Sequence, residues 1–190
     1  QWGMTLGGPI IKNKLFFFVN YENTNKTYPN LNGYRQSGSR VNPDEADDVM
    51  QKIKDMAQRQ GLSYDGTFAN PDIYTKSNKF GAKIDWNIND FNKFSFRWSY
   101  VDAKQLNVVS SASSLNDDHY YFPFTSKTNS FTAELQSRLS PVVSNEARVS
   151  YVRVRDKRNV SSAFPMISLQ VTGGSVNIGN ERSSMANSLD

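Results

Sequence analysis

The chain has 190 residues, no cysteine and a formal net charge of +4, so disulfide scaffolds, thiolate zinc sites and cysteine nucleophiles are excluded. Hydrophobic residues make up only 37% of the sequence and aromatic residues 13%, a balance that favours a polar, strand-rich chain over a helical bundle. No apolar stretch is long enough for a transmembrane helix, but membrane-spanning strands are short and alternate in polarity, so they escape that test.

The first predicted hairpin spans about residues 1–24. A strand near the N-terminus, with apolar residues at every second position, leads through the turn IKNK into LFFFVNYE. The apolar positions of the two strands are Trp2, Met4, Leu6, Leu15, Phe17, Val19 and Tyr21. Phe16 and Phe18 fall on the opposite face, and we predict that they pack inward.

A long polar connection follows, from about Thr24 to Lys76, and it contains one predicted helix over residues 43–60. Asn42 is a good N-cap, Pro43 suits the first helical position and Gly61 ends the pattern. The apolar stripe consists of Ala46, Val49, Met50, Ile53 and Ala57. This stripe either packs on its own loop or docks a partner such as a surface lipoprotein.

The second predicted hairpin, about residues 77–104, has the clearest alternation in the chain. Two segments, NKFGAKIDWNI and KFSFRWSY, flank a short turn, and each divides into an apolar and a polar face without interruption. The apolar faces carry Phe80, Ala82, Ile84, Trp86, Phe94, Phe96, Trp98 and Tyr100. The polar faces carry Lys79, Lys83, Asp85, Lys93, Ser95, Arg97 and Ser99.

A second long connection, from about Gln105 to Pro123, leads to a third predicted hairpin over residues 124–158. Its strands, SFTAELQSRL and EARVSYVRV, again alternate and flank a turn over residues 140–145. Glu134, Arg138 and Arg148 share the polar face.

The pattern as a whole predicts an all-β fold of antiparallel strands from a transmembrane β-barrel, with about six strands and one helix in a long loop. Short turns at one end and long loops at the other are typical of outer-membrane barrels. We predict that Phe80, Trp86, Phe94, Trp98 and Tyr100 face lipid, and that Lys83, Arg97 and Arg138 face the lumen along a substrate pathway. The alternative is a soluble β-sandwich that binds glycans through exposed aromatic side chains.

The segment GMTLGGPIIKNKLFFFVNYE resembles the start of the barrel in TonB-dependent outer-membrane receptors of the Oar-like type, which carry a carboxypeptidase-like regulatory domain. Gly7, Gly8, Pro9, Ile10, Lys12, Lys14, Phe16 to Phe18, Tyr21 and Glu22 carry the match. NKFGAKIDWNINDFNKFSFRWSY is similar to the following barrel hairpin of such receptors. The resemblance covers about two thirds of the chain and leaves out the long loops.

This resemblance implies a gated active transporter in the outer membrane of a Gram-negative bacterium, driven by the TonB complex acting on a plug domain. Barrels of this kind have 22 strands, so we expect the sequence to represent the N-terminal part of the barrel, without plug and remaining strands, and not to fold alone. A related sugar importer of the SusC type, partnered by a surface lipoprotein, is a further alternative.

We predict no catalytic, cofactor or metal site. His119 is the single histidine and lies in LNDDHYYF without the motif of a catalytic triad. Asn116, Asp117, Asp118 and His119 could ligate a cation, but they lack EF-hand spacing. Lys and Arg are spread along the chain, so we expect no nucleic acid as partner.

Overall fold

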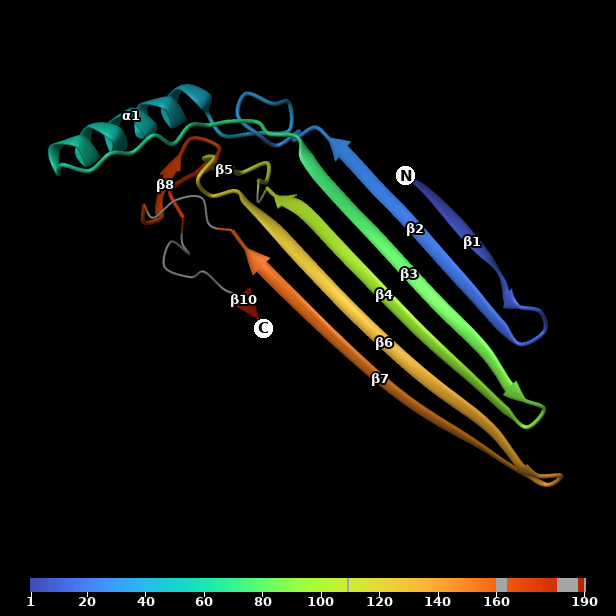
Figure 1. Ribbon diagram of the computed structural model, residues 1–190. Coiled ribbons are helices and arrows are strands. Elements are labelled where there is room, and N and C mark those ends of the chain that lie inside the picture. Colours follow the sequence, from blue (N-terminus) through green and yellow to red (C-terminus); the bar gives the residue numbers. More distant parts are fainter. Residues whose placement is uncertain (109, 160–163, 181–187, 190) are drawn as a thin grey trace.

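The computed structural model describes residues 1–108, 110–159, 164–180 and 188–189. One sheet of long antiparallel strands forms the body, and a smaller folded unit lies at one end of it (Figure 1). The strand order in the large sheet is β1-β2-β3-β4-β6-β7-β10. Its strands are β1 (Trp2–Ile11), β2 (Leu15–Tyr28), β3 (Ile73–Asn89), β4 (Asn92–Asn107), β6 (Phe122–Ser140), β7 (Val143–Arg158) and β10 (Ser188–Leu189).

The register of the sheet separates an apolar from a polar face. One row of paired residues, running from β1 to β7, is Leu6, Val19, Ala82, Trp98, Phe131 and Tyr151. The next residue on each strand points the other way and is mostly polar. We call the face with Trp98 the outer face and the opposite face the inner face. A slip of one residue would exchange the two faces, so the alternation fixes the register.

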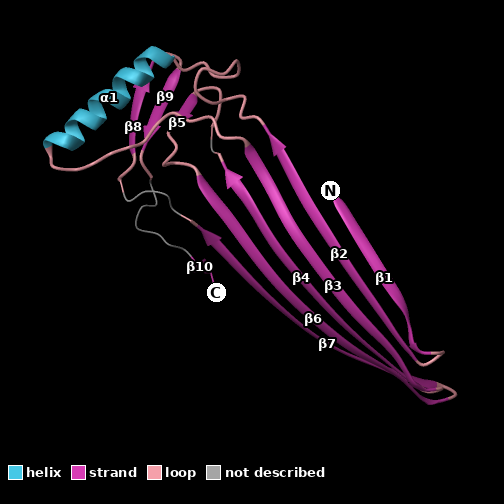
Figure 2. Ribbon diagram, turned by 45° about the horizontal axis from the view of Figure 1, so that its top comes forward, coloured by secondary structure: helices cyan, strands magenta, loops and turns pink. Residues whose placement is uncertain are grey.

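Aromatic side chains link the strands across the outer face. The ring centroids of Phe80 and Trp98 lie 5.2 Å apart, those of Trp98 and Phe131 lie 6.4 Å apart, and those of Phe131 and Tyr151 lie 6.5 Å apart. Such cross-strand pairs stabilise neighbouring strands. Figure 2 shows the long strands in a single layer, and within the described residues no second layer covers the aromatic row.

The strands are longer than the sequence predicted. The long connections were expected to begin near Thr24 and Gln105, but β2 continues to Tyr28 and β4 to Asn107. The predicted turn over residues 140–145 shrinks to two residues, because β6 ends at Ser140 and β7 begins at Val143. A membrane crossing needs only about 9 to 11 tilted residues, so these strands extend beyond the apolar band.

The smaller unit, which we call the cap, is built from three long connections: residues 29–72 between β2 and β3, residues 110–121 between β4 and β6, and residues 164–180, which follow β7. It holds α1 (Pro43–Arg59) and a three-stranded sheet in the order β5-β9-β8, with β5 (Ser114–Asn116), β8 (Ile167–Val171) and β9 (Gly174–Ile178). The sequence interpretation missed this sheet. Its strands are only three to five residues long, too short for the alternation to be recognised.

Helix α1 begins and ends almost as predicted. The side chain of Asn42 accepts hydrogen bonds from the backbone N–H groups of Asp44 and Glu45, and the last helical residue is Arg59. Ala46, Met50, Ile53 and Ala57 are buried against Leu115, Val176 and Ile178 of the cap sheet. The stripe therefore packs within its own loops and is not available for a partner. No helix in the described part of the chain combines the length and the apolar character needed to span a membrane.

The large sheet is not closed into a barrel. Its order begins with β1 and ends with β7 and the two-residue β10, and within the described residues β1 pairs with β2 alone. The structure is thus an open set of antiparallel barrel strands with one helix in a long loop, as the fold class predicted. An open edge is unstable within a bilayer, because its backbone polar groups find no partner there.

Candidate functional site

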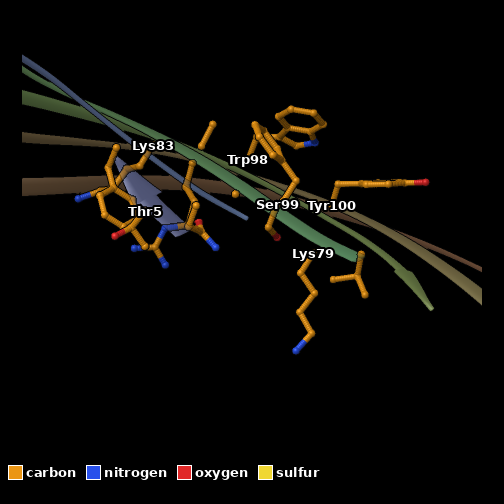
Figure 3. A pocket seen from close by; sticks show the side chains of 13 residues that line it. Thr5, Lys79, Lys83, Trp98, Ser99 and Tyr100 are labelled. Atoms are coloured by element: carbon orange, nitrogen blue, oxygen red, sulfur yellow. The ribbon is translucent and has the colours of Figure 1, made fainter. Parts of the chain in front are cut away.

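The inner face carries a shallow hollow of about 570 Å³ between β1, β2, β3 and β4. Lys79, Lys83 and Arg97 contribute cationic side chains to its wall, and Gly81 and Ser99 contribute small residues. A Cβ atom at Gly81 would collide with the side-chain oxygen of Asn20, so glycine is needed to let Asn20 lie across this position. Figure 3 shows Trp98 on one side of the sheet and Lys79 pointing away on the other.

Most charged groups around this hollow are neutralised by ion pairs. Lys83 Nζ lies 2.7 Å from Asp85 Oδ2, and Lys79 Nζ lies 2.7 Å from Glu22 Oε1. On the other side of Arg97, a second hollow of about 330 Å³ holds the pair of Arg148 and Glu134, with 2.8 Å between nitrogen and oxygen. These pairs leave little net charge to attract a ligand.

Arg97 differs from its neighbours. It lies opposite Lys83 in the register, borders both hollows and is exposed. Within the described residues its guanidinium group forms no ion pair with a carboxylate. The arrangement therefore presents the guanidinium group of Arg97, which is suited to a planar anion such as a carboxylate or phosphate, between two hollows, the first of which is also lined by Phe18 and Val101.

The structure brings together two of the three predicted pathway residues. Lys83 and Arg97 are register partners, but Arg138 lies near the short turns, six residues beyond the β6 partner of Arg97. Its backbone N–H donates to the carbonyl of Phe91 over 2.8 Å, and its guanidinium carbon lies 5.1 Å from the centre of the Phe91 ring. Arg138 is thus tied to the turn between β3 and β4.

The five residues predicted to face lipid all lie on the outer face. Phe80 pairs with Tyr100 in the register, Trp86 pairs with Phe94, and Trp98 lies between them on β4. Trp86 and Phe94 are close to the short turn, while Phe80 and Tyr100 are six positions further toward the cap. Phe16 and Phe18 pair with Asp85 and Lys83, which lie on the inner face.

In the cap, the Asp117 side chain forms hydrogen bonds that join the three long connections to one another. Its side chain is fully buried and accepts hydrogen bonds from the hydroxyl of Tyr64, from the N–H of Gly179 over 3.3 Å and from the N–H of Tyr120 over 3.1 Å. Tyr64 belongs to the first connection, Asp117 to the second and Gly179 to the third. One carboxylate therefore holds together parts of the chain more than 50 residues apart.

The side chains of Asp118 and His119 also contact other residues of the cap. The Asp118 carboxylate accepts hydrogen bonds from the N–H of Thr67 over 2.8 Å and from its hydroxyl over 2.9 Å. His119 Nε2 lies 3.1 Å from Asp65 Oδ1. Neither group was predicted to take part in folding, because their partners are more than 50 residues away and leave no local pattern in the sequence.

Burial raises the pKa of Asp117 from its ordinary value to about 7, and the nearby Asp118 carboxylate adds to the rise, while the N–H donors of Gly179 and Tyr120 oppose it. The folded cap thus holds a proton that the unfolded chain has already released above pH 4. This contribution to stability is present below pH 4 and is lost as the pH rises through about 7.

We therefore expect the cap to open more readily at pH 8 than at pH 6. Hydrogen exchange of the β9 amides, corrected for the intrinsic effect of pH, measures this difference in the full-length protein. Asp117→Asn should reduce the pH dependence strongly, because an amide carries no charge at either pH. An equally steep pH dependence in the folded Asp117→Asn variant would assign the effect to another group.

The family model described as an outer membrane beta barrel domain matches residues 1–34 and 23–188. Searches of curated proteins and of solved structures found no significant match. The family match places the chain in the outer membrane, where the apolar face of a barrel contacts lipid and its short turns face the periplasm. The two matched ranges together span nearly the whole sequence, and the chain therefore belongs to the outer membrane beta barrel domain family.

Proposed function

We propose that the chain is part of an active transporter of the TonB-dependent type, similar to the Oar-like receptors, which imports a substrate across the outer membrane and performs no chemistry on it. The main support for this proposal is the polarity of the inner face. On β3, β4, β6 and β7 it is mostly polar and charged from the cap to the short turns, as a water-filled or plug-filled lumen requires, while Phe16 and Phe18 of β2 are aromatic exceptions. The segment around Gly7 to Glu22, which resembles such receptors, forms the first hairpin of this wall.

The proposed barrel is a wide one, as in the receptors that the first hairpin resembles. Within the described residues the long strands pair only with their neighbours and leave the sheet open, so further strands are needed before a lumen is enclosed. Barrels with few strands fill their interior with side chains, while those with about 22 strands hold a plug. In the proposed transporter the TonB complex acts on that plug, and the cap lies at the extracellular end, where a substrate arrives first.

The soluble glycan-binding alternative fits the molecule less well. A sandwich would cover the outer face with a second sheet, but Ile84 and Trp86 are each 41% exposed there. The SusC-type alternative shares the barrel and differs by a surface lipoprotein partner. Because the α1 stripe is buried in the cap, such a partner would have to bind the exposed surface of the cap instead. Co-purification of the full-length protein with a lipoprotein would favour this alternative.

Growth on single nutrients tests the proposal. A strain that lacks the full-length protein is compared on a panel of nutrients with a strain that lacks TonB, and both are expected to fail on the same nutrient. The wild-type gene should restore growth in the first strain but not when TonB is also absent. Restored growth without TonB would contradict the proposed mechanism.

The same assay tests the substrate pathway. We propose that Lys83, Arg97 and Arg138 contact the substrate as it passes, and we expect Arg97→Gln to have the largest effect because Arg97 lacks a carboxylate partner within the described residues. Uptake of the identified nutrient should fall about tenfold, the usual loss for one charge-assisted contact. Lys12→Gln, which removes a cation from a short periplasmic turn, is the control and should leave uptake unchanged.

A further inference from the structure

A second charged surface lies on the outer face, between the aromatic row and the cap. On β7, Tyr151 is followed at every second position by Arg153, Arg155 and Lys157. The register places Lys127 of β6 beside Arg155, and Lys76 of β3 beside Lys104 of β4. All six side chains are exposed. We call this set the basic band: Lys76, Lys104, Lys127, Arg153, Arg155 and Lys157.

The region of the basic band contains many cationic side chains and few acidic ones. Asp102 is the single acidic residue among the described strand residues in this part of the outer face, and its carboxylate lies 3.8 Å from Lys127 Nζ. On the inner face at a similar distance from the cap, Glu22 pairs with Lys79, and Asp156 lies near Arg158 in sequence. Lys26 is a further cation on the inner face, but the excess of cations is larger on the side that faces the membrane.

The basic band also continues the lipid-facing surface. Arg153 follows Tyr151 by two positions on the same face, and Tyr151 ends the aromatic row that begins at Phe80. Aromatic side chains mark the boundary between the hydrocarbon and the polar headgroups. The cations thus lie at the depth of the headgroups, on the extracellular side of the boundary.

We propose that the basic band binds the phosphate groups of glycolipids in the outer leaflet of the outer membrane. Lys and Arg near a membrane surface attract anionic headgroups, and Arg matches phosphate with two parallel hydrogen bonds. Arg153, Arg155 and Lys127 form the centre of the site, because they lie on adjacent strands directly above Tyr151 and Phe131. Lys76 and Lys104, whose ammonium groups lie 5.3 and 5.9 Å from the centre of the Tyr74 ring, extend it toward β3.

The test uses the full-length protein, purified from outer membranes in mild detergent, and measures by mass spectrometry the phosphorylated glycolipid retained per protein. The variant carries Lys127→Gln, Arg153→Gln and Arg155→Gln. The control carries Lys12→Gln, Lys14→Gln and Lys93→Gln, which remove three cations near the short turns. The first variant should retain at least fivefold less glycolipid, about the effect of one cation near an anionic surface, and the control should retain the wild-type amount.

Rebinding to the delipidated protein identifies the recognised group. The phosphorylated glycolipid should bind at least about fivefold more tightly than the same glycolipid after enzymatic dephosphorylation. Equal binding of the two would overturn the proposal, as would unchanged retention by the triple variant. Binding of inorganic phosphate without retention of glycolipid would show a site for a free ion and would also overturn it. If the triple variant does not fold, Arg153→Gln and Arg155→Gln are measured singly, and wild-type retention in both counts against the site.

Discussion

Phe96→Lys is expected to prevent most of the full-length protein from inserting into the outer membrane. Phe96 lies on the outer face in the middle of β4, where Ile84 and Ala133 are its register partners. A lysine at the centre of the lipid-facing band destabilises a barrel by about 2 to 4 kcal/mol, and the aromatic contact with Phe131, at 6.4 Å between centroids, is lost as well. Because strand insertion requires an apolar band, we expect little folded protein in membrane fractions.

Ser95→Lys is the matched control. Ser95 is the adjacent residue of the same strand but lies on the inner face, where its register partners are Asp85 and Glu134. A lysine there gains two acidic neighbours and meets no lipid. The folded fraction is measured by the shift of the unheated protein in gel electrophoresis. If Phe96→Lys folds like wild type while Ser95→Lys does not, the assignment of the two faces is reversed.

The division into two faces could be predicted from the sequence because it depends only on neighbouring residues. In a strand, residues two apart share a face, so the positions of Trp86, Trp98 and Phe131 suffice to orient three strands. The short turns follow from the same pattern, since two alternating segments with a few polar residues between them pair as a hairpin. The helix was equally accessible, because Asn42 and Pro43 mark its start within one turn.

The packing of the cap could not be predicted, since its stability comes from contacts between distant parts of the chain. Leu115, Val176 and Ile178 lie in short segments without a usable period, and each becomes a core residue only when the three long connections meet. The same holds for Asp117, whose partners Tyr64 and Gly179 lie 53 and 62 residues away. Sequence patterns report local periodicity, and no local pattern distinguishes a packed loop from a loose one.

The cap and the barrel strands also differ in what stabilises them. Among the described residues, no buried apolar side chain lies on a long strand, and we expect the outer face of these strands to contact lipid. The cap, in contrast, has a compact core shared by α1, β5 and β9. Within the described residues, no helix or strand of the cap packs on a long strand of the sheet. A mutation in the core of the cap should therefore weaken the cap and leave the membrane-embedded strands folded.

Leu115→Ala tests whether the cap unfolds independently of the long strands, and we expect it to lower the stability of the cap strongly. Leu115 is 1% exposed and lies at the centre of the cap core, so removing its side chain should destabilise the cap by about 2 to 5 kcal/mol. Hydrogen exchange of α1 and β9 amides should accelerate strongly, while the amides of β3 and β4 keep their wild-type rates. Leu62→Ala is the control, because Leu62 follows the helix but is 57% exposed, and its exchange should match wild type. Acceleration in β3 and β4 of the Leu115→Ala protein would mean that the cap and the barrel strands unfold as one cooperative unit.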